Sequence, residues 1–250
     1  MLAMIFAAGL GTRLRPVTDT IPKALLPLGG KTLLQYQIER LRDAGIQDMV
    51  VNVHHFPDQI IQYLQDNRNF GCKIQVSDER DRLLDTGGGL LKAQALLHSA
   101  DTPILACNVD ILSNIDIRQL IASHQDSDIA TLVVSDRQTQ RYLLFDQTQK
   151  MIGWTNISTG EVRPSGISAS EATKLAFSGM QILSPNIFTW MEKLKKEKGD
   201  KFSLIDLYLS VCQQETVRAF VPQNYRMMDV GKIDHLREAE EFAMRLMGER

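Results

Sequence analysis

The sequence predicts an α/β protein with a Rossmann-like, doubly wound sheet that is mixed but mainly parallel, followed by a small antiparallel lobe. Over the first 135 residues, short β-rich runs alternate with helical patterns, which is typical of βαβ units. After Asp136, short strand-like runs follow one another without intervening helices. A chain of 250 residues can bury one substantial core. We therefore expect a single domain over 1–250, with halves over 1–135 and 136–250.

The first half contains apolar or β-branched runs bounded by turn residues, which predict strands. These cover 2–7, 49–53, 73–77, 104–107 and 129–135. Between them, apolar residues recur at helical spacing, and glycine or proline marks several helix ends. The helices expected there cover 33–44, 57–64, 89–97 and 117–123.

The second half predicts strands at shorter intervals, which favours antiparallel pairing. They cover 142–145, 151–155, 161–163, 177–183, 217–221 and 226–230. Helices are expected over 185–198 and 234–247, the second of them amphipathic. The charged end of the first, 192–198, is interpreted as a solvated face.

Composition restricts the possible partners and the compartment. The net charge is −2, so no basic face predicts binding to nucleic acid or to an anionic membrane. No run approaches the roughly 20 apolar residues that span a bilayer, and the apolar start is too short for a signal peptide. The three cysteines are widely separated, which argues against a zinc site or a disulfide framework. We expect a cytoplasmic protein, as a monomer or small homo-oligomer.

The most informative segment is the loop after the first strand, Ala7 to Gly29, which carries the cations Arg13 and Lys23. Open α/β sheets bind ligands at the carboxyl ends of their strands. Small residues let backbone N–H groups approach phosphate oxygens, and fixed cations neutralise their charge. This pattern indicates a nucleoside triphosphate site. The small residues expected to bind the nucleotide are Ala8, Gly9, Gly11 and Thr12.

Two common phosphate-binding loops do not match. A dinucleotide fingerprint requires a third glycine where Leu14 stands. A Walker A loop requires a glycine where Leu25 stands, and Pro27 would lie inside it. NAD chemistry and kinase-type triphosphate chemistry are therefore disfavoured.

The whole stretch instead resembles the signature of the sugar-1-phosphate nucleotidylyltransferases. In that family a strand leads into Ala-Gly-x-Gly-Thr-Arg-Leu, and Pro-Lys-x-Leu-x-Pro follows. Arg13, Pro22 and Lys23 fall on this pattern in order. The resemblance implies that Arg13 and Lys23 are catalytic, that the substrates are a nucleoside triphosphate and a sugar 1-phosphate, and that Mg²⁺ is the cofactor. It also implies a nucleotide-binding first half and a sugar-binding second half.

A second segment, 84–93, contains three consecutive glycines that open an expected helix. Bare backbone amides and a flat surface suit a planar base. The family has Glu-Thr-Gly-Gly at this place, against the nucleobase, and Asp85 is a conservative departure from it. The residues expected to bind the nucleotide here are Asp85, Thr86, Gly87 and Gly88.

Two aspartates are candidate metal ligands. Asp110 follows a buried strand, where a carboxylate can hold a hard cation such as Mg²⁺. The resemblance implies that Asp229 is the second ligand, because Asp229 and Gly231 match a family segment Trp-x-Asp-x-Gly-Thr. Val109 and Met227 depart from the family's glycine and tryptophan next to the two aspartates.

Candidates for contact with the sugar are Asn108, Asn156 and Gly179. Gly179 lies in a Phe-Ser-Gly segment that resembles the family's sugar-facing segment. A Glu-Lys-Pro segment that several branches use is absent from the sequence.

The reaction implied by the resemblance is attack of the sugar phosphate on the α-phosphorus of the triphosphate, with pyrophosphate leaving. The attacking phosphate is already anionic, so no general base is needed. We expect Lys23→Ala to lower turnover at least a hundredfold and to leave thermal stability nearly unchanged.

Several alternatives remain open. The branch that acts on N-acetylmuramate 1-phosphate with UTP is the most similar, and guanylyltransferases for mannose or heptose 1-phosphate are close. Outside the family, a non-catalytic nucleotide-sugar sensor would be consistent with Val109 and Met227. A glycosyltransferase is disfavoured, because only the second acid of an Asp-x-Asp pair is present at 108–110.

Overall fold

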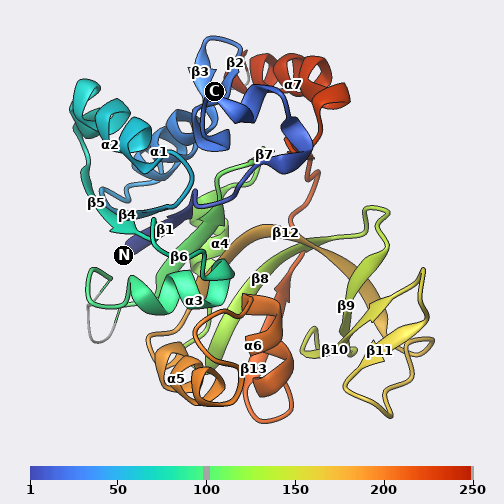
Figure 1. The fold of residues 1–250 in the computed structure, drawn as a ribbon. Helices are drawn as coiled ribbons and strands as arrows, with labels where there is room; N and C mark the ends of the chain where they lie inside the picture. Colours follow the sequence, from blue (N-terminus) through green and yellow to red (C-terminus); the bar gives the residue numbers. More distant parts are fainter. Residues whose placement is uncertain (98–101, 249–250) are drawn as a thin grey trace.

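The computed structural model describes residues 1–97 and 102–248, and within them one mixed sheet lies between two layers of helices (Figure 1). The sheet contains the strands β1 (Leu2–Phe6), β4 (Asp48–Val53), β5 (Lys73–Asp78), β6 (Ile104–Asn108), β8 (Asp128–Ser135), β12 (Thr173–Leu183) and β13 (Thr216–Phe220). The helices are α1 (Leu33–Asp43), α2 (Pro57–Asp66), α3 (Asp85–Lys92), α4 (Ile117–Ser123), α5 (Ile187–Lys198), α6 (Leu204–Val211) and α7 (Leu236–Gly248).

The order of strands confirms a mixed, mainly parallel sheet. Strands β5, β4, β1 and β6 are parallel neighbours, as the βαβ pattern predicts. The next strand, β12, is antiparallel to both β6 and β8. Strand β8 therefore runs parallel to β6, and their carboxyl ends lie at the same edge of the sheet. That edge is where open α/β sheets bind ligands.

Apolar side chains cover both faces of the sheet, because alternate residues of a strand point to opposite sides. In β1, Ala3 and Ile5 pack in one core with α1, α2, α4 and α7. Met4 and Phe6 pack in a second core with α3, α5 and α6. All four side chains are 8 % exposed or less, so β1 is the buried centre of the fold.

The antiparallel lobe is built from three strands and the start of β12, at the right of Figure 1. The strands are β9 (Arg141–Phe145), β10 (Met151–Asn156) and β11 (Glu161–Arg163). β12 pairs with β9 through Thr173–Leu175 and with β6 and β8 through its later residues. This long strand joins the lobe to the main sheet.

Some elements differ from the expectation. Helix α3 begins at Asp85 and ends at Lys92, so the glycine triplet lies inside the helix and residues 93–97 do not extend it. Helix α6 was not predicted, although Ser203 and Asp206 form a capping box at its start. Strands β2 (Pro27–Leu28), β3 (Lys31–Thr32) and β7 (Ile111–Ser113) were missed, because strands of two or three residues carry little periodicity. The strand expected over 226–230 is present as β14 (Met227–Asp229), and its pairing with β7 was not predicted; β2 pairs with β3.

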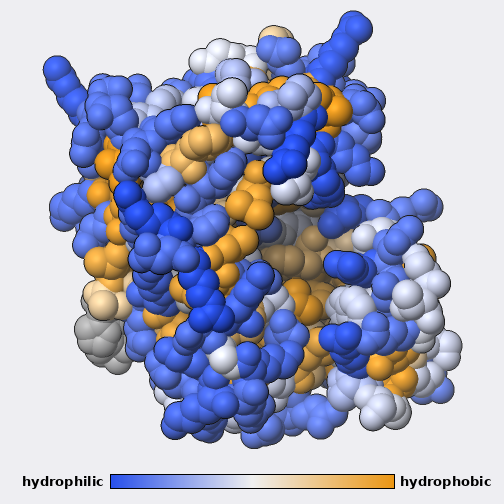
Figure 2. Space-filling view, in the orientation of Figure 1, coloured by the Kyte–Doolittle hydropathy of each residue, from blue (hydrophilic) through white to orange (hydrophobic). Residues whose placement is uncertain are grey.

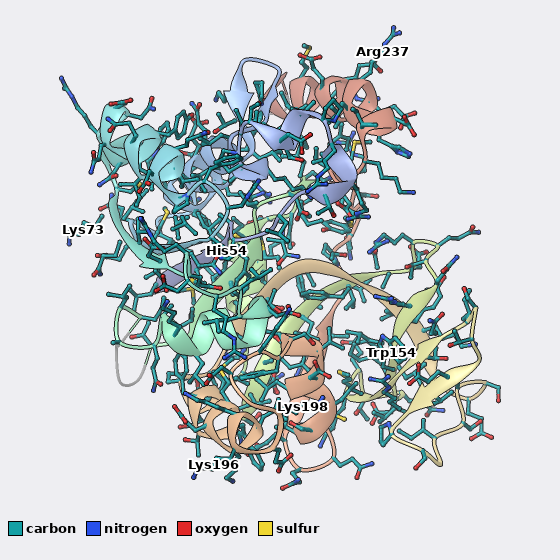
Figure 3. All side chains as sticks on the ribbon, viewed as in Figure 1. His54, Lys73, Trp154, Lys196, Lys198 and Arg237 are labelled. Carbon is teal, nitrogen blue, oxygen red and sulfur yellow. The ribbon has the colours of Figure 1, made fainter. Side chains whose placement is uncertain are left out.

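The charged end of α5 is exposed as predicted; Lys196 projects from the surface (Figure 3), and Lys198 pairs with Asp206 at the start of α6. In the described part of the chain, no helix combines the length and the apolar character that crossing a bilayer requires.

Candidate active site

The loop after β1 folds back on itself and carries its two cations to the carboxyl edge of the sheet. Gly11 has φ +64°, and a Cβ there would lie 2.8 Å from Thr18 Cγ2 and 3.2 Å from Lys23 Cβ. Only glycine suits this turn, because its positive φ is unfavourable for other residues. The Thr18 hydroxyl donates to the Gly11 carbonyl at 2.8 Å. The turn thereby holds Lys23 beneath the loop, where its side chain is 9 % exposed.

The β7–β14 ribbon brings the two aspartates together from distant parts of the sequence. Asp229 pairs with Ile111, and the backbone N–H of Val230 donates to the Asp110 carbonyl at 2.9 Å. Asp110 immediately precedes β7 and Asp229 ends β14, so the two aspartates lie on facing segments of the ribbon. Burial raises the pKa of Asp229 above its usual value, and the negative charge of Asp110 raises it further.

All four predicted charged residues converge at this edge. Lys23 Nζ forms an ion pair with Asp110 Oδ2. A Cβ on Gly231 would lie 2.7 Å from Asp229 Oδ1 and 2.8 Å from Arg13 Nη2, so Arg13 and Asp229 meet beside this glycine. The arrangement is two cations interleaved with two carboxylates.

A pocket of ≈ 390 Å³ opens over these groups. Eight of the residues predicted to form the site line it: Gly9, Gly11, Thr12, Arg13, Lys23, Thr86, Asn108 and Asp110. The sequence missed Leu10 and Leu83, two apolar residues at which nothing local indicates a ligand. Such side chains suit the faces of a nucleobase or ribose, while the charged groups suit phosphates.

The glycine triplet is placed differently from the expectation. The N–H groups of Gly87 and Gly88 both donate to the carbonyl of Phe202, at 3.0 and 3.1 Å. A Cβ on Gly88 would collide with the carbonyl oxygen of Asp200. These glycines are buried against the segment between α5 and α6, and neither they nor Asp85 line the pocket. The N–H groups of Gly87 and Gly88 are thus engaged within the protein, and Thr86 is the residue of 85–88 that lines the pocket. The contact of Asp85, Gly87 and Gly88 with a nucleotide stays a prediction.

A buried carboxylate that the sequence analysis did not single out connects the two loops that line the pocket. Glu79 has no exposed surface; its Oε1 accepts from Asn52 Nδ2 at 2.6 Å, and its Oε2 accepts from the Leu84 N–H at 3.2 Å. Asn52 Oδ1 in turn accepts from the Ala7 N–H at 2.8 Å. Burial raises the pKa of Glu79. A glutamate after a strand carries no local sign of burial, so only the fold reveals it.

The sugar candidates separate into two groups. Asn108 lines the pocket at the end of β6, and Gly179, with φ +71°, lies against it: a Cβ there would be 3.2 Å from Asn108 Nδ2. Asn156 lies in the antiparallel lobe, where its Oδ1 accepts from the Ser158 N–H at 3.0 Å. This side chain stabilises its own turn and does not line the pocket, so the role of Asn156 in binding the sugar stays a prediction.

The donor set fits a hard divalent cation only together with a ligand that supplies further oxygen atoms. Asp110 and Asp229 offer two neighbouring carboxylates. In the described part of the chain, no group of three or more histidine, cysteine or acidic side chains could enclose a metal ion. Mg²⁺ is commonly held by one or two carboxylates plus substrate phosphates and water. The two aspartates meet that requirement.

Comparison with known proteins identifies the family of the chain. A family model described as nucleotidyl transferase matches residues 2–245. An N-acetylmuramate α-1-phosphate uridylyltransferase of Caulobacter vibrioides is 32 % identical over 232 residues, which cover 90 % of each chain. The enzyme of the same name from Neisseria meningitidis is 31 % identical and covers 97 % of this chain and 98 % of its own. A mannose-1-phosphate guanyltransferase of Neurospora crassa is 38 % identical, but over 54 % of this chain and 37 % of its own.

Solved structures share the fold. A glucose-1-phosphate thymidylyltransferase structure from Bacillus anthracis superposes with a TM-score of 0.81 at 16 % identity, covering 97 % of this chain and 95 % of that one. HddC from Yersinia pseudotuberculosis, complexed with GMP-PN, superposes with a TM-score of 0.73 at 25 % identity, covering 96 % and 98 %. The central sheet with its helices is therefore common to all three.

Proposed function

The chain belongs to the nucleotidyl transferase family and has the sugar-1-phosphate nucleotidyltransferase activity of its relatives, and we propose that it is an Mg²⁺-dependent enzyme that makes UDP-N-acetylmuramate from UTP and N-acetylmuramate 1-phosphate. The observation that carries the mechanism is the convergence of Arg13 and Lys23 with Asp110 and Asp229 at the carboxyl edge of the sheet. The choice of sugar and base rests on two relatives that match over nearly the whole chain.

In the proposed reaction, a sugar phosphate oxygen bonds to the α-phosphorus of UTP, and the bond from that phosphorus to the β-phosphate oxygen breaks. The half over 1–135 binds the nucleotide, and the half over 136–250 contributes to binding the sugar. Gly9, Gly11 and Thr12 present backbone N–H groups to the phosphates. Arg13, at the open side of the loop, neutralises the departing pyrophosphate.

Lys23 is assigned to the α-phosphate. Its buried position beneath the loop fixes the ammonium where charge accumulates on the non-bridging oxygens. The acceptor phosphate is already ionised near neutral pH, so the residues need only to position the two phosphates and neutralise them. Positioning and electrostatics are the usual means of catalysis in phosphoryl transfer.

Asp110 and Asp229 would hold Mg²⁺. When bound, the ion would supply charge neutralisation for the polyphosphate. The protein's own contribution is to keep two carboxylates adjacent despite their repulsion, through the fixed register of the β7–β14 ribbon.

A second candidate function is guanylyl transfer to a sugar 1-phosphate, supported by the Neurospora crassa relative and by the HddC structure with GMP-PN. Outside the enzymes, a nucleotide-sugar sensor would bind the same ligands without chemistry. The test is a matrix of four nucleoside triphosphates against sugar 1-phosphates, scored by pyrophosphate release with Mg²⁺. The proposal expects UTP with N-acetylmuramate 1-phosphate to be the fastest pair. If another pair were fastest, that pair would replace the proposed substrates. If no pair released pyrophosphate, the result would favour a nucleotide-sugar sensor.

A further inference from the structure

A second cavity, of ≈ 330 Å³, lies beyond the candidate active site and is lined by three arginines. Arg137 follows β8, Arg226 precedes β14, and Arg245 belongs to α7. They come from three separate parts of the sequence, so no local pattern predicts their grouping. One carboxylate, that of Asp136, also lines the cavity, which therefore has an excess of positive charge.

The cavity lies on the acceptor side of the site. Strand β8 runs parallel to β6, so Arg137 emerges at the same edge of the sheet as Asn108 and Asp110. Arg137 Nη2 donates to the carbonyl of Phe177 at 3.0 Å. Phe177 is two residues before Gly179, which contacts Asn108. Arg137 thus borders the segment where the sugar is expected.

Strand β14 connects the cavity to the metal candidates. Met227 lines the cavity, and Asp229 is the next residue on the same side of the strand. Two residues of a strand span about 7 Å. A sugar ring that bears an acid on a short arm can bridge this separation.

Arg137 and Arg245 are available to a ligand. Arg137 and Arg245 are exposed and form no ion pair with a carboxylate in residues 1–97 and 102–248. Ser135, at the cavity, keeps a buried hydroxyl that has no hydrogen-bond partner within the same residues. Guanidinium groups favour planar, bidentate binding of a carboxylate.

We propose that this cavity binds a carboxylate carried by the acceptor sugar, so that the enzyme selects an acidic sugar 1-phosphate over its neutral counterpart. The inference rests on the proposed function, because the 1-phosphate of the sugar must lie beside Asp110 and Asp229 for the carboxylate to reach the arginines. Met227 stands where the family has tryptophan. It places a slimmer side chain between the expected position of the 1-phosphate and the arginines.

The test uses two ligands that differ only in the acid. N-acetylmuramate 1-phosphate is N-acetylglucosamine 1-phosphate with a lactyl ether at the 3-oxygen. Binding of each is measured by calorimetry in the presence of Mg²⁺, and kcat/KM is measured with UTP. The variants are Arg137→Gln and Arg245→Gln. The matched control is Arg237→Gln, on the same helix as Arg245, since Arg237 projects away from the molecule (Figure 3).

The wild type is expected to prefer the lactyl sugar at least tenfold in both measurements. Either cavity variant should lower that preference at least fivefold, whereas the Arg237→Gln control should retain it. Equal binding of the two sugars by the wild type, or no binding of the lactyl sugar, would overturn the proposal. The proposal would also be overturned if a cavity variant bound both sugars more weakly by the same factor. That result would indicate that the arginines bind the 1-phosphate. Absence of pyrophosphate with both acceptors would refute the proposed function, while the calorimetric preference still tests the cavity.

Discussion

The ammonium of Lys23 forms an ion pair with the carboxylate of Asp110, although 86 residues separate them in the chain. The cation assigned to the nucleotide thus rests against an acid assigned to the metal. A pocket lies over this ion pair. Figure 2 shows a hollow in the surface between α7 and the antiparallel lobe. In the proposed mechanism, nucleotide and metal would replace this internal pair with contacts of their own.

Lys23→Ala should therefore impair both catalysis and stability. We expect turnover to fall at least a hundredfold, since losing one fixed charge in such a site costs about 3–4 kcal/mol. The sequence alone predicts a nearly unchanged thermal stability, but the side chain is buried and paired, so we expect the free energy of unfolding to fall by about 1–3 kcal/mol. Steady-state kinetics and urea unfolding measure the two effects. Lys31→Ala, which removes an ion pair with Glu39 outside the pocket, should leave turnover unchanged. Equal turnover in the Lys23 variant and its parent would remove Lys23 from the mechanism.

Asp229→Asn should stabilise the metal-free protein and abolish its response to Mg²⁺. The carboxylate is disfavoured by burial and by Asp110, so a neutral amide of the same size relieves a repulsion. A gain of about 1 kcal/mol corresponds to a Tm increase of about 2–4 °C in a chain of this size. Thermal unfolding of both proteins, with and without Mg²⁺ and UTP, measures this. A variant whose Tm still rises with Mg²⁺–UTP as much as the wild type would show that Asp229 does not hold the metal.

Glu79→Gln should raise the KM for UTP more than it lowers kcat. The amide retains an oxygen for Asn52 but cannot also accept from the Leu84 N–H, so the second pocket loop loses its anchor. Glu79→Ala should raise this KM further, because both contacts are lost. If the two variants changed kcat alone, Glu79 would have a role other than positioning the loops.

Glu79 also predicts a pH dependence of stability. Its folded pKa lies above the unfolded value of 4.5, because burial disfavours the carboxylate. The folded state therefore binds the proton of Glu79 more tightly than the unfolded state does. The contribution of this protonation to the free energy of unfolding declines as pH rises from 4.5 through the raised pKa. Relative to the wild type, Glu79→Gln should gain stability as pH rises over this window. Urea unfolding at pH 4.5 and pH 8 gives the comparison, and a constant difference between the two proteins would contradict the assigned shift.

Two glycine substitutions should separate packing from ligand binding. Gly88→Ala inserts a methyl group into the backbone at Asp200 and should destabilise the protein by about 1–3 kcal/mol. Gly9→Ala meets no atom within 4 Å and should leave Tm unchanged, yet raise the KM for UTP because Gly9 lines the pocket. Thermal unfolding and kinetics of both variants provide the measurement. Normal stability in Gly88→Ala would contradict the close packing of Gly88 against the backbone of Asp200.

These sites show which features the sequence can predict. Strands such as β4 and β6 were predicted within a residue or two, because buried parallel strands are nearly continuous apolar runs with clear ends. The first loop was predicted because its motif is local. By contrast, the antiparallel insertion of β12 between β6 and β8 depends on pairing between distant residues.

The sequence is ambiguous where one residue type serves two purposes. Gly87 and Gly88 permit close approach of a backbone, and the sequence does not say whether that backbone belongs to a ligand or to residues 200–202. Asn156 could bind a sugar or stabilise a turn, and it stabilises a turn. The arginine-lined cavity and Glu79 required the tertiary structure, because their partners are remote in the chain.

The most direct test of nucleotidyl transfer follows the phosphorus atoms. UTP labelled with ³²P at the α position, or separately at the γ position, is incubated with the protein, Mg²⁺ and N-acetylmuramate 1-phosphate. If Arg13, Lys23, Asp110 and Asp229 act as proposed, the α label appears in a UDP-sugar and the γ label in pyrophosphate. Recovery of the γ label as inorganic phosphate or on the sugar, or of all label in unchanged UTP, would contradict the account.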